Sequence, residues 1–213
     1  LAEAAARAGK TMQVNFQRRF SHASRNAKAI MATDDFGGLT QLFCSFCSGA
    51  YGSREDYLLD FAIHHFDLCR HLAGNVRRLA SMENITGGQA SFAVSVEFES
   101  GAVAQILVSA NHRTNRQGLL LGRVLGARGR IDFTVYPYKR TLNEATLTID
   151  HGKKLFVADT ETTKLRIPDL PSRSEVYPGF FDVYDRQAAA FIKSVQTGTP
   201  PPCTLADGRQ AIE

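Results

Sequence analysis

Carboxylates and imidazoles, side chains well suited to moving protons near neutral pH, alternate along one stretch of this chain. Asp60, His64, Asp67 and His71 follow one another at intervals of four, three and four residues. Residues three or four apart lie on one face of an α-helix. A carboxylate beside an imidazole fixes the tautomer and orientation of the ring and stabilises its protonated form, which suits general acid–base catalysis. Asp60 and His64 are therefore candidates for proton transfer, and a solvated polar stripe is the alternative.

The element that must position these residues is a helix over about residues 55–72. Apolar residues recur there at helical spacing, Gly and Pro are absent, and Gly74 follows as a stop signal. A metal site built from Asp60, His64 and Asp67 or His71 is a further alternative. Because one straight helix does not converge more than two ligands on one ion, we expect no metal site.

Further motifs surround this helix in a fixed order. Residues 60–74 are similar to the signature Asp-x-Gly-x-His-x-x-Asp followed by Leu-x-Gly, although Ala62 departs from the usual Gly. The other similar segments are Val-Asn-Phe-Gln-Arg-Arg-Phe at 14–20, Val-Glu-Phe-Glu-Ser-Gly-Ala at 96–102, Val-Leu-Gly-Ala-Arg-Gly-Arg-Ile at 124–131, and Phe-Ile, Thr-Gly and Asp-Gly-Arg-Gln-Ala between 191 and 211. Together they span nearly all of the chain, which resembles the C-terminal, substrate-binding part of the Gfo/Idh/MocA family of nicotinamide-dependent oxidoreductases.

This resemblance implies a reaction and residues to carry it. The implied enzyme transfers a hydride between NAD or NADP and a sugar, polyol or related hydroxy or keto compound, with His64 as general acid/base and Asp60 as the group that orients or charges it. Arg18 matches a family position that reaches the substrate, and Gln17 and Asp67 complete the predicted substrate-binding set. Such donors bind hydroxyls or a carboxylate. A non-catalytic ligand-sensing or interaction module of the same fold is the alternative, which Ala62 keeps open.

The glycine fingerprint that seats a cofactor pyrophosphate is absent from the sequence. No Gly-x-Gly-x-x-Gly opens a strand-to-helix turn, and the family's Glu-Lys-Pro motif is also missing. We expect the cofactor-binding residues to lie upstream of Leu1. Residues 1–17 are then the tail of a truncated nucleotide-binding domain, residues 18–213 form the substrate-binding and oligomerisation domain, and this fragment alone is expected to be inactive.

The hydrophobic pattern predicts an α+β fold. Helices are expected at 1–8, with Gly9 as the stop, and at 21–31, capped by Ser21, with a strand at 12–16 between them. A strand at 39–47 follows. From Val76 to Val157 the apolar residues recur at every second position, which predicts strands near 77–85, 90–97, 102–110, 118–125, 130–133, 145–149 and 154–157. Tight turns predict a large, mostly antiparallel open sheet with helices on one face. The resemblance implies a glyceraldehyde-3-phosphate dehydrogenase-like C-terminal domain that associates into a homo-oligomer through the other face.

Composition and net charge narrow the remaining classes of protein and of binding partner. The chain has 213 residues, 44% of them hydrophobic, which is enough for a sizeable core. Its net charge of +4 comes from scattered basic residues, and no known nucleic-acid recognition motif accompanies them, so we expect no nucleic-acid partner. No run long enough for a membrane span occurs, and we expect a soluble, cytoplasmic protein. Cys44 and Cys47 lie three apart on a predicted strand and face opposite ways, which indicates structural rather than redox or zinc-binding cysteines.

Overall fold

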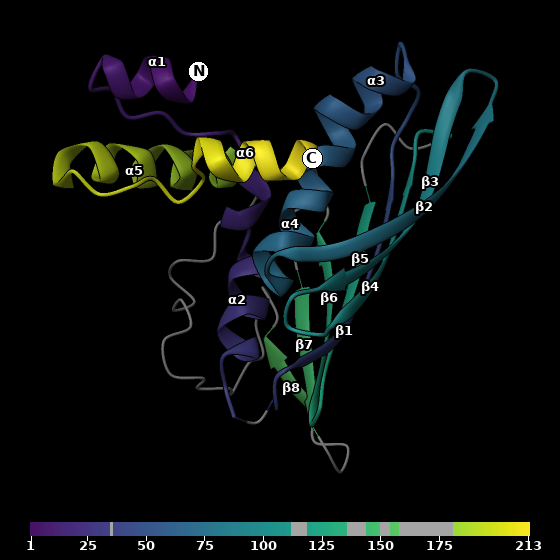
Figure 1. Ribbon diagram of the computed structural model, residues 1–213. Coiled ribbons are helices and arrows are strands. Elements are labelled where there is room, and N and C mark those ends of the chain that lie inside the picture. Colours follow the sequence, from purple (N-terminus) through teal and green to yellow (C-terminus); the bar gives the residue numbers. More distant parts are fainter. Residues whose placement is uncertain (35, 112–118, 136–143, 150–153, 158–180) are drawn as a thin grey trace.

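One open sheet of eight strands organises the molecule (Figure 1). The computed structural model describes residues 1–34, 36–111, 119–135, 144–149, 154–157 and 181–213. The strands are β1 (Leu39–Cys47), β2 (Val76–Thr86), β3 (Gln89–Phe98), β4 (Val103–Ser109), β5 (Leu119–Gly126), β6 (Gly129–Val135), β7 (Glu144–Ile149) and β8 (Lys154–Val157). Their order across the sheet is β2-β3-β4-β1-β5-β6-β7-β8. Neighbouring strands are antiparallel except β1 and β4, which are parallel, so the predicted mostly antiparallel sheet is confirmed.

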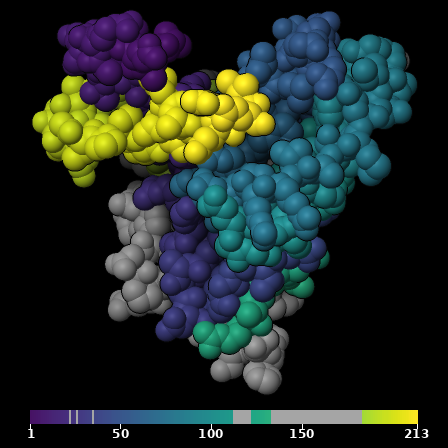
Figure 2. All heavy atoms as spheres, viewed as in Figure 1, coloured from purple at the N-terminus to yellow at the C-terminus, as the bar shows by residue number. Residues whose placement is uncertain are grey.

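Helices gather on one side of this sheet. They are α1 (Ala2–Arg7), the 3₁₀ turn η1 (Gln17–Phe20), α2 (His22–Met31), α3 (Arg54–Asp56), the π-helix η2 (Tyr57–Ala62), α4 (Ile63–Ala73), α5 (Phe181–Thr197) and α6 (Leu205–Ile212). Helices α2 and α4 pack against the strands, whereas α5 packs against η1 and α6 packs against α4 (Figure 1). In the space-filling view, α1, α5 and α6 lie together at one end of the molecule (Figure 2).

The two faces of the sheet differ as the period-two pattern predicts. On β4, Ala104, Ile106 and Val108 are buried under the helices, while Val103 and Leu107 are exposed on the opposite face. The same alternation on β1 buries Cys44 and leaves Cys47 partly exposed, as expected for residues three apart on a strand. Among the described residues all four cysteines are free thiols.

The predicted strand at 12–16 is wrong, because this segment pairs with no strand of the described residues. Its backbone is held instead by single contacts: the Val14 N–H donates to the Cys203 carbonyl oxygen (3.0 Å), and the Gln187 side-chain amide donates to the Val14 carbonyl oxygen (3.0 Å). A strand needs a neighbouring strand to satisfy its backbone groups, and a single such contact does not form a ladder. The segment therefore runs as an extended connection into η1.

The turn between β5 and β6 shows why a glycine is needed in the motif at 124–131. A Cβ added to Gly126 would lie 2.1 Å from the Phe36 carbonyl oxygen. That same oxygen accepts the N–H groups of Arg128 and Gly129, both at 3.2 Å. The missing side chain thus lets the segment after α2 approach the sheet and bond to this turn. None of the described helices is long and apolar enough to cross a membrane.

Candidate functional site

The helix that carries the proton-transfer candidates has three parts. Its ends agree with the prediction: the Ser53 side chain accepts the Asp56 N–H at 3.0 Å, and Gly74 follows α4 with φ of +94°. A single regular helix over 55–72 is wrong, however, because η2 is a π turn. Its i→i+5 bonding places Tyr57 and Ala62, five residues apart, together in the core at 0% exposure. Ala62, which departs from the family's glycine, is thus a core residue.

His64 lies directly after the π turn, in the first turn of α4. Its ring packs edge-on against Phe16 with ring centres 6.1 Å apart, and among the described residues its buried Nδ1 has no hydrogen-bond partner. Burial, and then the positive charge of Arg18, lower the pKa of His64 to about 4, while Asp60 acts in the opposite direction. The ring is therefore neutral at physiological pH and able to accept a proton.

Asp60 acts on His64 through its charge rather than through a direct hydrogen bond. Because the π turn changes the spacing, no hydrogen bond joins the two side chains in the described part of the chain. Instead, the Tyr51 hydroxyl donates to Asp60 Oδ2 at 3.1 Å. The predicted orienting role of Asp60 thus stays a prediction, in which the carboxylate stabilises the imidazolium electrostatically.

Arg18 and Gln17, the predicted substrate-binding residues of η1, lie close to this helix. Arg18 is 6% exposed, and its guanidinium lies over the rings of Phe46 and Phe61, 4.9 and 5.8 Å from their centres. Its charge lowers the pKa of both His64 and His65, behind the larger effect of burial. The Gln17 Oε1 is buried without a hydrogen-bond partner among the described residues. The structure therefore brings Arg18 and His64 together from segments 46 residues apart in sequence.

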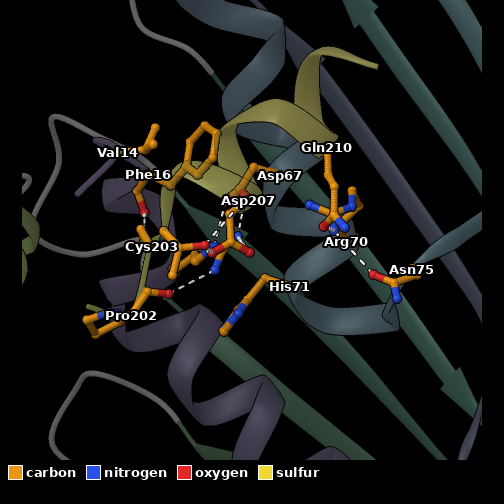
Figure 3. Close-up of polar contacts among 12 residues, drawn as sticks. Val14, Phe16, Asp67, Arg70, His71, Asn75, Pro202, Cys203, Asp207 and Gln210 are labelled. Atoms are coloured by element: carbon orange, nitrogen blue, oxygen red, sulfur yellow. Dashed lines mark hydrogen bonds and ion pairs between the residues drawn. The ribbon is translucent and has the colours of Figure 1, made fainter. Parts of the chain in front are cut away.

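Asp67 does not share the surroundings of Asp60 and His64. It is fully buried, and both carboxylate oxygens bond to Arg19, at 2.8 Å to Nε and 2.5 Å to an Nη. The same guanidinium donates to Asp207 of α6 at 3.0 Å and to the Pro202 carbonyl oxygen at 3.1 Å (Figure 3). This arrangement gives Asp67 a structural partner, and its predicted contact with substrate has no support in the geometry.

The pair of Arg19 and Asp67 is ionised, despite its burial. Burial alone lowers the pKa of Arg19, but the hydrogen bonds and charge of Asp67 outweigh it and raise the pKa well above the usual range. Burial raises the pKa of Asp67, and the hydrogen bonds and charge of Arg19 oppose that shift. A guanidinium does not lose its proton in proteins, and its two-point contact at 2.5 and 2.8 Å favours the carboxylate anion. Sequence analysis missed this contact because Asp207 lies 188 residues from Arg19. Its one local signal is the capping box of Thr204 and Asp207 at the start of α6.

The helix carries two further histidines, of which His65 is buried and His71 is half-buried. His65 is fully buried, and its ring lies against those of Phe46 and Phe61. Burial lowers the pKa of His71 to about 4, with further contributions from Lys28 and Arg19. In the described ranges, no group of three or more His, Cys, Asp or Glu side chains is arranged to hold a metal ion.

The described residues supply only part of what a nicotinamide cofactor and its substrate would require of a binding site. The described residues provide a neutral imidazole, a carboxylate and a guanidinium, which can exchange a proton with a polar ligand and donate hydrogen bonds to it. They do not form the glycine-rich turn between a parallel strand and a helix that cradles a pyrophosphate. Within the described ranges, therefore, no turn is shaped to hold the pyrophosphate of the cofactor.

Comparison with known proteins identifies the lineage. Residues 57–213 match the Gfo/Idh/MocA family described as "Oxidoreductase family, C-terminal alpha/beta domain". The chain belongs to the Gfo/Idh/MocA oxidoreductase family. No curated protein matches its sequence.

Solved structures of dehydrogenases and oxidoreductases share the fold of this chain. An NAD-binding oxidoreductase from Klebsiella pneumoniae has a TM-score of 0.76 at 18% identity, over 99% of this chain and 63% of its own. Levoglucosan dehydrogenase in complex with NADH has a TM-score of 0.75 at 17% identity, over 95% and 61%. UDP-N-acetylglucosamine 3-dehydrogenase from Acidithiobacillus ferrooxidans has a TM-score of 0.71 at 15% identity, over 98% and 60%. The chain thus spans less than two thirds of the length of these neighbours, and their likeness supports the predicted C-terminal fold.

The buried ion pair generates a stability prediction. We expect Asp67→Asn to lower the free energy of unfolding by about 3 kcal/mol, because the Arg19 charge stays buried without its anionic partner. Asp60→Asn, the same change at an exposed site of the same helix, is expected to cost about 0.5 kcal/mol or less. Urea unfolding followed by circular dichroism measures both. Equal losses in the two variants would contradict a structural role for Asp67.

The three histidines of α4 generate a pH prediction. Burial lowers the pKa of His64 and His71 to about 4 and that of His65 well below its usual value. In the unfolded chain all three titrate near 6.5. The unfolded state therefore binds protons first as the pH falls, so their contribution to stability is complete above about pH 6.5 and is lost toward pH 4.

The measurement is the free energy of unfolding at pH values between 7.5 and 4.5. His71→Gln removes one titrating group, and we expect it to reduce the slope of stability against pH by up to about 1.4 kcal/mol per pH unit. A slope that is unchanged in this variant would show that His71 does not titrate differently in the folded and unfolded states.

Proposed function

We propose that this chain is the substrate-binding part of an NAD(P)-dependent dehydrogenase that acts on a sugar, polyol or related hydroxy or keto compound. The observation that carries the proposal is the neutral, half-buried His64, which lies within the electrostatic influence of Arg18 and Asp60. Membership of an oxidoreductase family supports the reaction class. The sugar dehydrogenases among its structural neighbours support the substrate class.

In the proposed reaction His64 handles the proton. When a substrate hydroxyl is oxidised, its oxygen gives its proton to the imidazole while the carbon gives up a hydride, so that a carbonyl forms. A bound nicotinamide supplies the hydride acceptor, and in the reverse direction the donor. Asp60 lowers the free energy of the imidazolium that results, and in reduction the same imidazolium returns its proton to the alkoxide oxygen.

Arg18 and Gln17 have complementary tasks in this proposal. The guanidinium disfavours a proton on His64 before substrate arrives, and its donors and the Gln17 amide bind hydroxyl or carboxylate oxygens of the substrate. Gln17 Oε1 is a buried acceptor without a partner among the described residues, which supports its proposed role as the acceptor for a substrate hydroxyl.

The test uses the full-length protein from the complete reading frame, with NAD and NADP and a panel of sugars, polyols and their keto forms. We expect His64→Ala to lower kcat by about 100-fold or more, because general acid–base catalysis contributes roughly that factor, and to leave cofactor binding intact. His71→Gln, seven residues further along the same helix, is the control and should retain turnover. Cofactor binding without turnover in the unmodified protein would instead favour a ligand-sensing module.

We also propose that a second copy of the chain packs on the open face of the sheet. Large apolar side chains are exposed there: Phe43 (39%), Met82 (75%), Val103 (46%) and Leu107 (36%). The pairing register places them on one face: Phe43 is on β1, Val103 and Leu107 are on the neighbouring β4, and Met82 is on β2, which β3 separates from β4. Gln105 lies between Val103 and Leu107 and beside Phe43, so this face is mixed in polarity. Burying its exposed apolar side chains against a second copy would remove apolar surface from water, which favours association.

Sedimentation of the Val103→Lys, Leu107→Lys double variant tests this proposal. We expect the unmodified protein to sediment as an oligomer and the variant to shift to the monomer, because lysines on the joined faces would lose hydration. Leu79→Lys, an equally exposed position that faces the helix side of the sheet, should leave the mass unchanged. An unmodified protein that is monomeric at micromolar concentration would refute the proposal.

A further inference from the structure

We infer that Tyr51 is a positioning residue of the site, which holds the Asp60 carboxylate in the place from which it acts on His64. The Tyr51 hydroxyl donates to Asp60 Oδ2 at 3.1 Å. The inference rests on the proposed function only for its effect on turnover, since the contact itself is a property of the fold.

Tyr51 is well anchored, although it lies in the connection between β1 and α3. Its backbone N–H donates to Gln89 Oε1 at 2.8 Å, and the Gln89 amide donates to the Tyr51 carbonyl oxygen at 3.0 Å. Gln89 is the first residue of β3, so this two-point contact ties the connection to the sheet. The Tyr51 ring also packs against Tyr57 and Phe61, with ring centres 5.4 and 5.6 Å away. The hydroxyl is therefore presented from a rigid base.

Asp60, by contrast, needs a partner to stay in place. Its side chain is exposed, and an exposed carboxylate loses rotamer freedom only where a bond compensates for it. In the structure that bond comes from Tyr51. Without it, we expect the carboxylate to turn toward water, where its effect on the imidazole is screened.

The charged and titratable groups around His64 make the position of Asp60 important. Arg18 from η1 disfavours the imidazolium, the neighbouring His65 is neutral, and Asp60 from η2 favours it. Asp60 therefore supplies the attraction that opposes burial and Arg18. If the carboxylate moves away, the imidazole becomes a weaker base, and the proton transfer that it serves becomes slower.

The same aromatic cluster offers a matched control. Tyr57 is 0% exposed and packs beside Tyr51, yet its hydroxyl has no hydrogen-bond partner among the described residues. Tyr57→Phe and Tyr51→Phe remove the same atom from neighbouring rings. Only the second substitution removes a bond to Asp60.

The experiment is a histidine ¹³C NMR measurement of the protonated fraction of His64 at pH 5, with folding checked by circular dichroism. We expect Asp60→Asn to lower that fraction by about tenfold and Tyr51→Phe by about threefold, in the same direction. Tyr57→Phe should leave it unchanged. In the Asp60→Asn background, Tyr51→Phe should have no further effect, because Tyr51 acts through the carboxylate.

Two results would overturn the inference. If Tyr51→Phe leaves the protonated fraction at its original value, Tyr51 does not position Asp60. If its effect persists in the Asp60→Asn background, Tyr51 acts on His64 by another route.

Turnover in the full-length protein is a separate readout. There Tyr51→Phe should lower kcat roughly threefold to tenfold with KM little changed, since a misplaced charge affects the transition state more than substrate binding. An inactive unmodified protein would refute the proposed function, whereas the NMR result would still decide the role of Tyr51.

Discussion

The buried ion pair between Arg19 and Asp67 is the constraint on which the rest of the site depends. It joins η1 to α4, and the further bond from Arg19 to Asp207 adds the first turn of α6. An unpaired charge in this place would be strongly unfavourable, so the three segments keep one relative arrangement. Arg18 precedes Arg19 in η1, and His64 lies one helical turn before Asp67. Fixing the ion pair therefore fixes the distance between the guanidinium of Arg18 and the imidazole of His64.

This distance determines the chemistry that the site supports. Burial and Arg18 both favour the neutral imidazole, and Asp60 alone of the three influences favours its protonated form. An imidazole that is neutral at rest can accept a proton, and a carboxylate nearby stabilises the ion that this transfer produces. The π turn contributes by separating Asp60 from His64, so that the carboxylate bonds to Tyr51 and acts on the ring through space. π turns of this kind are frequent at functional sites.

The sheet gives the site a rigid support on one side and an apolar surface on the other. Strands β1 and β4 lie in its middle, and their buried side chains, Phe46 among them, form the floor beneath α4. The Phe46 ring also contacts the ring of His65 and the guanidinium of Arg18. The core and the site thus share side chains, and the two faces of the sheet serve different purposes: one positions the helix with His64, and the other leaves apolar residues exposed.

The sequence by itself determined the elements and the lineage. The helix at 21–31 with its Ser21 cap, the strand at 39–47 and seven further strands follow from local periodicity and turn residues, which depend on near neighbours in the chain. The motif around His64, read as a resemblance, identified the oxidoreductase family. Tertiary structure alone decided how the charges pair. In the sequence, Asp67 and Asp60 are equivalent members of one helical stripe. In the structure, Asp67 pairs with Arg19, 48 residues away, whereas Asp60 accepts a hydrogen bond from Tyr51. The predicted strand at 12–16 is absent for the same physical reason. The hydrogen-bond partner of a carboxylate or a backbone amide depends on residues distant in sequence and not on the local pattern.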